Sequence, residues 1–215
     1  MSCRKHVVIT GTGRAGTTFL VELLTALGMD TGYDVDDLPV RKSSIARAGL
    51  EHDIRHDDSP YIVKSPFFCD YADEVLARPD IRVDRIFVPI RDLYAAAESR
   101  RQVEQSTMSA MSVLHRIRRR FKRKALPGGL WSVATGDADD QERVLLEKLY
   151  RLMLGVSGHP VPTTFLRYPL LVEDSSYLFE KLRPILTGTS HDEFRTAHGK
   201  IARRELVHDF ALPSV

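Results

Sequence analysis

The sequence has few cysteines, no long hydrophobic run and almost no net charge. Its two cysteines, Cys3 and Cys69, lack the spacing of metal ligands, which predicts reduced structural thiols in a cytoplasmic protein. The first apolar run, residues 7–9, is broken by Gly11 and is too short for a signal peptide. No run of about 20 apolar residues could span a membrane. A formal net charge of +2 gives no reason to expect a nucleic-acid partner.

No internal repeat or low-complexity tract divides the chain. Short apolar runs alternate with helical patterns from end to end, which is typical of parallel α/β proteins. With 215 residues, of which 43% are hydrophobic, the chain can bury one sizeable core. We therefore expect one domain over residues 1–215. Its expected fold is doubly wound α/β, with a mainly parallel sheet of four to five strands flanked by helices.

Hydrophobic periodicity predicts the individual elements. Strands are expected over residues 7–9, 61–63, 85–90 and 161–166. Helices are expected from the end of residues 11–18 to Gly28, and over residues 43–50, 70–78, 92–124, 141–154 and 175–185. Pro89 lacks an N–H for the sheet, so we expect a bulge or a strand end there. Residues 194–210 are expected to form a polar, basic tail.

The glycine-rich stretch of residues 11–18, GTGRAGTT, organises the chain. It follows the apolar run 7–9 and precedes an amphipathic helical pattern, and this order is that of the phosphate-binding unit of α/β proteins. Gly11 and Gly16 have the spacing of a Walker A loop, but Thr17 stands where that motif has lysine. Kinases and ATPases use that lysine on the β- and γ-phosphates. The stretch therefore predicts a phosphate site without triphosphate chemistry.

Two more cations stand where predicted strands end. Lys64 follows residues 61–63, and Arg91 follows residues 85–90. Ligands of parallel α/β sheets bind beyond the carboxyl ends of the strands. We therefore expect Lys64 and Arg91 to lie beside the glycine-rich loop.

A basic run lies further along the chain, where residues 116–124 contain seven cations in nine positions. The simplest interpretation is a solvated helix face, and attraction to an acidic substrate or a membrane surface is the alternative. Few aromatic residues interrupt the run, which argues against binding of single-stranded nucleic acid.

These motifs together resemble the sulfotransferase family, whose members transfer a sulfuryl group from 3′-phosphoadenosine 5′-phosphosulfate (PAPS). Residues 13–18 (GRAGTT) are similar to the family's 5′-phosphosulfate loop. Residues 86–92 (IFVPIRD), followed by Ser99 and Arg100, resemble its 3′-phosphate motif. Residues 64–66 (KSP) and 165–171 (FLRYPLL) resemble the second-strand motif of bacterial and carbohydrate sulfotransferases and the RYEDL-type strand end. The resemblance implies a P-loop NTPase-like sulfotransferase fold.

The resemblance also implies roles for single residues. It places the binding of the donor's 5′ end on Gly13, Arg14, Ala15, Gly16, Thr17 and Thr18, and that of the 3′-phosphate on Arg91 and Ser99. Arg14 would stabilise charge on the bridging oxygen as it leaves. Lys64 would assist at the sulfuryl or leaving group. The family uses no metal, which agrees with the missing Walker lysine.

Two departures from the family pattern bear on catalysis. Ala15 replaces the usual loop serine, and Pro66 stands where cytosolic sulfotransferases have a catalytic histidine. Carbohydrate and bacterial relatives often take their base from a glutamate between the first helix and the second strand. In this chain that pattern nominates Glu51 as the general base, with His52 and His56 as alternatives.

The expected function is therefore PAPS-dependent sulfuryl transfer to a hydroxyl of a carbohydrate, glycolipid or other small metabolite. A divergent P-loop small-molecule kinase is one alternative, although Thr17 in the lysine position argues against it. A non-catalytic nucleotide-binding module is another, and Ala15 and the missing histidine favour it.

Overall fold

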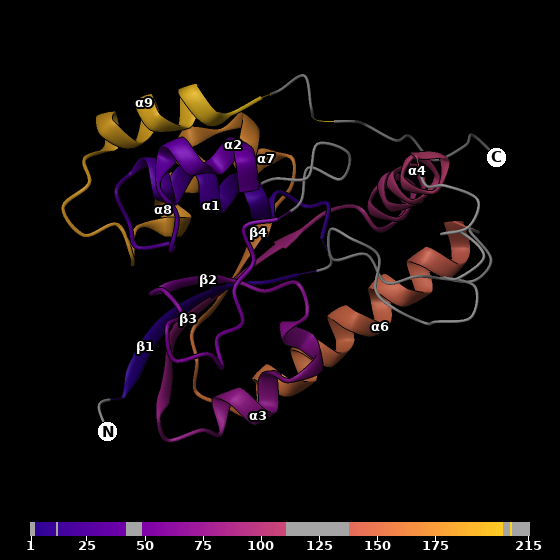
Figure 1. Cartoon of the computed structure of the whole chain (residues 1–215), viewed down its shortest axis with the longest axis horizontal. Coiled ribbons are helices and arrows are strands. Elements are labelled where there is room, and N and C mark those ends of the chain that lie inside the picture. The colour runs from indigo at the N-terminus through magenta and orange to yellow at the C-terminus, as the bar shows by residue number, and fades with distance from the viewer. Residues whose placement is uncertain (1–2, 12, 42–48, 111–137, 204–206, 208–215) are drawn as a thin grey trace.

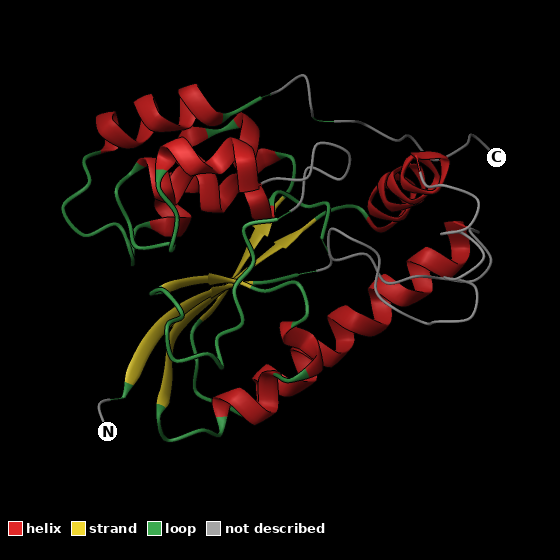
Figure 2. Ribbon diagram, viewed as in Figure 1, coloured by secondary structure: helices red, strands yellow, loops and turns green. Residues whose placement is uncertain are grey.

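The computed structural model describes residues 3–11, 13–41, 49–110, 138–203 and 207 (Figures 1 and 2). They form an α/β fold around a four-stranded, all-parallel sheet of order β2-β1-β3-β4. The strands are β1 (Arg4–Ile9), β2 (Ile62–Lys64), β3 (Ile81–Ile90) and β4 (Thr163–Arg167). The predicted α/β class and parallel sheet are thus confirmed.

The order of the strands creates a switch point in the sheet. From β1 the chain moves to the edge strand β2, and then passes β1 to reach β3 and finally β4. The connections after β1 and after β3 therefore leave in opposite directions, and in sheets of this kind ligands bind at the carboxyl ends of two such strands.

One face of the sheet packs against α1 (Thr17–Ala26), α8 (Ser175–Leu182) and α9 (His191–Ile201) (Figure 1). Alternate strand residues point to that face, among them Val7, Ile9 and Phe87, all fully buried. These strand residues and the apolar sides of the three helices make the larger of the two cores.

The opposite face packs against η2 (Phe68–Asp70), α3 (Ala72–Leu76) and α6 (Ala138–Ser157). Val8, Ile86 and Val88 point to that side and lie in one core with Leu152 of α6. The sheet is therefore buried on both faces, which explains why its strands are almost continuously apolar.

The remaining described elements are η1 (Val35–Asp37), α2 (Leu38–Arg41), α4 (Leu93–Ala110) and α7 (Leu170–Glu173). Asp92 caps α4, because its carboxylate accepts from the N–H of Ala95 at 2.9 Å. Figure 1 shows α4 beyond the carboxyl ends of the strands. Within the described ranges, no helix has the length and hydrophobicity needed to cross a membrane.

Pro89 occupies a regular position near the end of β3, so the predicted strand end is observed at this point and the alternative, a bulge, is not. It pairs in register with Leu166, and the strand ends one residue later at Ile90. The backbone hydrogen-bonding groups of Phe87 and Pro89 point toward β1. The register of β1 with β3 ends at Ile9, opposite Phe87, so Pro89 lies where no further N–H is needed for the ladder. The register irregularity lies instead between His6 and Val7.

The predicted tail contains a helix that periodicity alone did not predict. α9 begins with a capping box, in which Ser190 and Glu193 satisfy each other's backbone N–H groups. Phe194 and His198 then bury one side of the helix. The predicted short helix at residues 43–50 and the basic run at 116–124 fall wholly or largely outside the described residues.

Candidate functional site

The glycine-rich loop lies at the carboxyl end of β1 and leads directly into α1. Gly13, Arg14 and Gly16 have φ values of 73°, 58° and 90°, so the backbone turns through the left-handed region three times. Gly16 is the N-cap residue of α1, and no described side chain caps this end or adds an acidic group to its first turn. The first N–H groups of a helix have no intrahelical partner and attract anions.

Packing explains the glycines at the two ends of the loop. A Cβ on Gly11 would lie 3.0 Å from the carbonyl oxygen of Pro89, and one on Gly16 would lie 2.9 Å from Cδ1 of Leu171. Gly13 differs, because the nearest atom to a Cβ there would be a guanidinium nitrogen of Arg100 at 3.7 Å. Gly13, in the middle of the loop, therefore lies beside the Arg100 guanidinium, while Gly11 and Gly16 pack against β3 and α7.

Arg14, Arg91 and Ser99 come together at the switch point. Nε of Arg14 donates to Oγ of Ser99 at 3.2 Å, and Nη1 of Arg91 donates to the carbonyl oxygen of Arg14 at 3.3 Å. The guanidinium carbon of Arg91 also lies 4.8 Å from the centre of the Tyr168 ring. The two expected anion sites therefore adjoin each other, and Arg14 joins them.

Lys64, the last residue of β2, connects the loop to Glu51. Its buried ammonium donates to Oγ1 of Thr18 at 3.0 Å and to the carbonyl oxygen of Gly49, and lies 3.5 Å from Oε1 of Glu51. Burial lowers the pKa of Lys64, whereas the Glu51 carboxylate opposes that change. The carboxylate therefore helps to keep a buried cation beside the loop.

Glu51 lies on a segment of unusual backbone. Leu50, which precedes it, has a φ of 60°, and within the described ranges only Arg14 is another non-glycine residue with positive φ. Tyr33 donates its hydroxyl to the backbone oxygen of Glu51 at 3.4 Å. The Glu51 side chain is 31% exposed. Strained residues concentrate at functional sites. Leu50 lies between Gly49 and Glu51, which both contact Lys64, and Arg14 is part of the glycine-rich loop.

The two alternative bases lie in other surroundings. The ring of His52 packs against Tyr33 at a centroid distance of 4.8 Å, and burial lowers its pKa. The backbone oxygen of His56 accepts from Arg4, which begins β1 at the far end of the sheet. Glu51, in direct contact with Lys64, is therefore better placed than either histidine.

Arg100 belongs to the 3′-phosphate motif, but the sequence predicted no role for it. Its side chain is almost completely buried, at 1% exposure, and its Nε donates to Oε1 of Gln141 on α6 at 3.1 Å. The neighbouring Arg101 pairs with Glu98 at 2.6 Å and is partly exposed. The sequence pattern of the helix does not predict which of the two arginines is buried. Arg100 is buried because α6 packs beside it, and the position of α6 cannot be read from this pattern.

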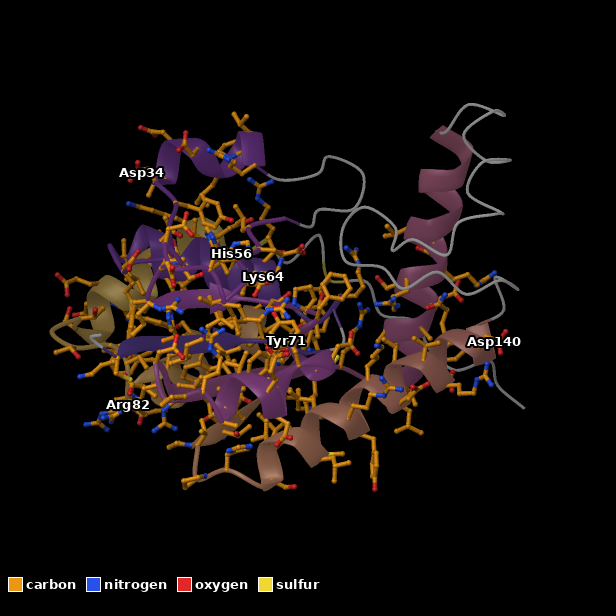
Figure 3. All side chains as sticks on the ribbon, turned by 60° about the horizontal axis from the view of Figure 1, so that its bottom comes forward. Asp34, His56, Lys64, Tyr71, Arg82 and Asp140 are labelled. Carbon is orange, nitrogen blue, oxygen red and sulfur yellow. The ribbon has the colours of Figure 1, made fainter. Side chains whose placement is uncertain are left out.

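Figure 3 shows the side chains from another direction and labels Lys64 and Tyr71 near the middle of the molecule. Tyr71 lies beside β2 as well, because its hydroxyl is 2.6 Å from Oγ of Ser65, which follows Lys64. Arg82, near the start of β3, is labelled at the other side of the same view. The contacts of Lys64 and Tyr71 at the carboxyl end of β2 therefore lie away from the opposite end of the sheet, where β3 begins with Arg82 near its start.

The arrangement joins a helix N-terminus to Arg14, Lys64, Arg91 and Arg100, and places Glu51 at its border. Such a set of groups can bind an anion with more than one charged group, and can accept a proton beside it. No protein family model matches the sequence, and no curated protein matches it closely enough to count as a relative. Function must therefore be inferred from the chemistry of these side chains.

Proposed function

We propose that the protein is a cytoplasmic, PAPS-dependent sulfotransferase with a doubly wound, P-loop NTPase-like sulfotransferase fold. Its acceptor is a hydroxyl of a carbohydrate, glycolipid or other small metabolite, and no nucleic acid takes part. The observation that carries the proposal is the meeting of the glycine-rich loop, Arg91 and Ser99 at the switch point of the sheet. Thr17 in place of the Walker lysine favours this donor over a nucleoside triphosphate.

The groups present fit a donor that is anionic at both ends. The N-terminus of α1, with the backbone of Gly13 to Thr18, holds the 5′ end. Arg91 can donate two hydrogen bonds to the 3′-phosphate, and the Ser99 hydroxyl can add one. The guanidinium of Arg14 donates to Ser99 and its backbone carbonyl accepts from Arg91, so Arg14 connects the loop to the two residues that we assign to the 3′-phosphate.

Transfer replaces one sulfur–oxygen bond by another. The acceptor oxygen forms a bond to sulfur while the bond between sulfur and the bridging oxygen breaks, and adenosine 3′,5′-bisphosphate leaves. Glu51 takes the proton of the acceptor hydroxyl. Arg14 stabilises the negative charge that develops on the bridging oxygen.

Lys64 serves this reaction in two ways. Its contact with Thr18 places a positive charge beside the loop, where the sulfuryl group is held. Its ion pair with Glu51 orients the carboxylate, and its bond to the Gly49 carbonyl holds the segment that carries Glu51. Lys64 is therefore a positioning residue for the base as well as a cation at the reacting group.

Calorimetric titration of the wild-type protein tests the proposal. We expect adenosine 3′,5′-bisphosphate to bind in the presence of EDTA, and ATP with Mg²⁺ to bind far more weakly. Labelled sulfur should then pass from PAPS to at least one member of a panel of hydroxyl acceptors. ATP turnover that needs Mg²⁺ would support the kinase instead. Tight bisphosphate binding with no transfer to any acceptor would support a non-catalytic module.

A further inference from the structure

Helix α6 presents a stripe of large apolar side chains to solvent. Leu146, Tyr150, Met153 and Leu154 are 56%, 62%, 43% and 64% exposed. They make up half of the large hydrophobic side chains that are exposed in the described part of the chain. Their spacing of four, three and one residues places them on one side of the helix. We name these four residues the α6 stripe.

The α6 stripe is separate from the side by which α6 packs on the protein. Leu152 is buried in the core below the sheet, with Leu149 and Val156 packed against that core, and Leu145 is buried against Ala96 and Ala97 of α4. Among the described elements, none covers the side of α6 that faces away from the sheet in Figure 1. A helix that is apolar on two sides is buried on both in the functional state.

We propose that the α6 stripe is a dimer interface, in which α6 packs antiparallel against the same helix of a second copy. A two-fold axis at Tyr150 sets Leu146 opposite the partner's Leu154, and the same contact occurs again on the other side of the axis. The apolar stripe thereby becomes the centre of a self-complementary interface, with exposed charges as its rim. This inference does not depend on the proposed function.

The charges beside the α6 stripe favour a second copy as the occupant. Glu147 and Arg151 are 55% and 54% exposed and form an ion pair one helical turn apart. In the antiparallel arrangement, Glu147 lies about 3 Å along the axis from the partner's Arg151, since each residue advances the helix by about 1.5 Å. The same flank of each helix faces the other copy, so two attractive pairs form between the protomers.

The ends of α6 are complementary in the same arrangement. Arg143, 76% exposed, lies on the same side as the α6 stripe, near the N-terminal end of α6. The last turn of α6 contains no basic residue. An antiparallel partner brings Arg143 to the C-terminal end of the other helix, where its charge opposes the negative end of the helix dipole.

Sedimentation velocity of the full chain over a range of concentrations tests the proposal. We expect a dimer of the 24.3 kDa chain. Tyr150→Glu should sediment as a monomer, with circular dichroism confirming that the variant is folded. Val40→Glu is the matched control, because Val40 is 85% exposed on a different helix. A monomeric wild-type protein, or equal effects of the two variants, would overturn the proposal.

A charge exchange tests the antiparallel arrangement itself. Glu147→Arg and Arg151→Glu should each weaken the dimer by roughly tenfold or more, because each places like charges opposite each other. An equimolar mixture of the two variants should recover association, since both cross-pairs become attractive in the mixed dimer. A mixture that remains as weak as its components would overturn the arrangement. So would a wild-type monomer that binds lipid vesicles through the α6 stripe.

Discussion

At the scale of single residues, the candidate site depends on side chains that are held in place from two sides. Lys64 is bonded to the loop through Thr18 and to the Glu51 segment through the carbonyl of Gly49. Arg100 is bonded to α6 and lies beneath Gly13. The sequence predicted the position of Lys64, because this residue ends a strand. Arg100 was part of the 3′-phosphate motif, but its position beside the loop depends on a long-range contact with α6 that the motif does not reveal.

The position of Glu51 supports a direct test of the general base. Glu51→Gln should leave the affinity for adenosine 3′,5′-bisphosphate nearly unchanged, because the nucleotide contacts that we propose are made by the loop, Arg91 and Ser99. Sulfuryl transfer should fall by about 10²–10⁴-fold, which is the usual contribution of a general base. Rates from a transfer assay and affinities from calorimetry together check this prediction.

Asp58→Asn is a suitable control for the base, since Asp58 is an exposed carboxylate of the same segment. It should leave both the transfer rate and the affinity unchanged. Transfer at the wild-type rate in Glu51→Gln would exclude Glu51 as the base.

Arg100 gives a second prediction at this scale. Arg100→Met should weaken bisphosphate binding by about tenfold or more, because the loop loses the cation beside Gly13. It should also lower the free energy of unfolding by about 1–3 kcal/mol, since the amide of Gln141 loses a buried hydrogen-bond donor. Arg101→Met should leave bisphosphate binding nearly unchanged, because Arg101 pairs with Glu98 instead of lying beside the loop, but it should also lower the free energy of unfolding, since the Glu98 side chain is only 12% exposed. Equal binding losses in both variants would show that Arg100 has no special relation to the loop.

At the scale of elements, local signals predicted the helix ends well and the helix content less well. Gly28 ends α1 with a φ of 74°, and the N–H groups of Gly28 and Met29 bond back to Thr25 and Leu24. Asp174 caps α8, since its carboxylate accepts from the N–H groups of Ser176 and Tyr177. α9 was missed although its capping box is visible in the sequence, because its apolar side is narrow.

Two glycines in different backbone conformations predict opposite effects on stability. Gly28→Ala should lower the free energy of unfolding by about 1 kcal/mol, because alanine is strained at positive φ although no atom lies within 4 Å. Gly199→Ala should raise it by about 0.5–1 kcal/mol, because Gly199 is helical and also has open space. Urea unfolding of the two variants checks the signs, and a change in the same direction in both would contradict the helix ends described here.

At the scale of the whole molecule, the strand order brings distant motifs together. The sequence predicted that the glycine-rich loop, Lys64 and Arg91 would share one edge of a parallel sheet, and the structure places them there. It did not predict that Arg14 would bond to Ser99, because that contact depends on the angle at which α4 leaves β3. The placement of Glu51 likewise depends on the left-handed turn at Leu50.

The buried imidazoles of His6 and His52 should make the free energy of unfolding depend on pH. Burial lowers the pKa of His6 and of His52 below the ordinary value of 6.5. Below about pH 6.5 the unfolded chain therefore binds protons that the folded chain does not, and the free energy of unfolding falls as the pH falls. The loss reaches at most about 1.4 kcal/mol per pH unit for each histidine. Urea unfolding between pH 7.5 and pH 5.5 measures this slope.

Single-residue variants separate the contribution of one imidazole from the rest. His52→Gln should reduce the slope, because one of the two buried groups is lost. His191→Gln should leave it unchanged, since His191 is exposed. An unchanged slope in His52→Gln would show that the buried ring does not cause the pH dependence.

The most direct test of the account asks whether Arg91 recognises the 3′-phosphate of a nucleotide whose 5′ end lies on the loop. Calorimetry should compare adenosine 3′,5′-bisphosphate with adenosine 5′-monophosphate on the wild type, on Arg91→Ala and on Arg82→Ala, an exposed control at the start of β3 (Figure 3). We predict that Arg91→Ala weakens bisphosphate binding by about 1.5–3 kcal/mol and leaves monophosphate binding unchanged. An equal loss for both nucleotides, or no loss for either, would contradict the account.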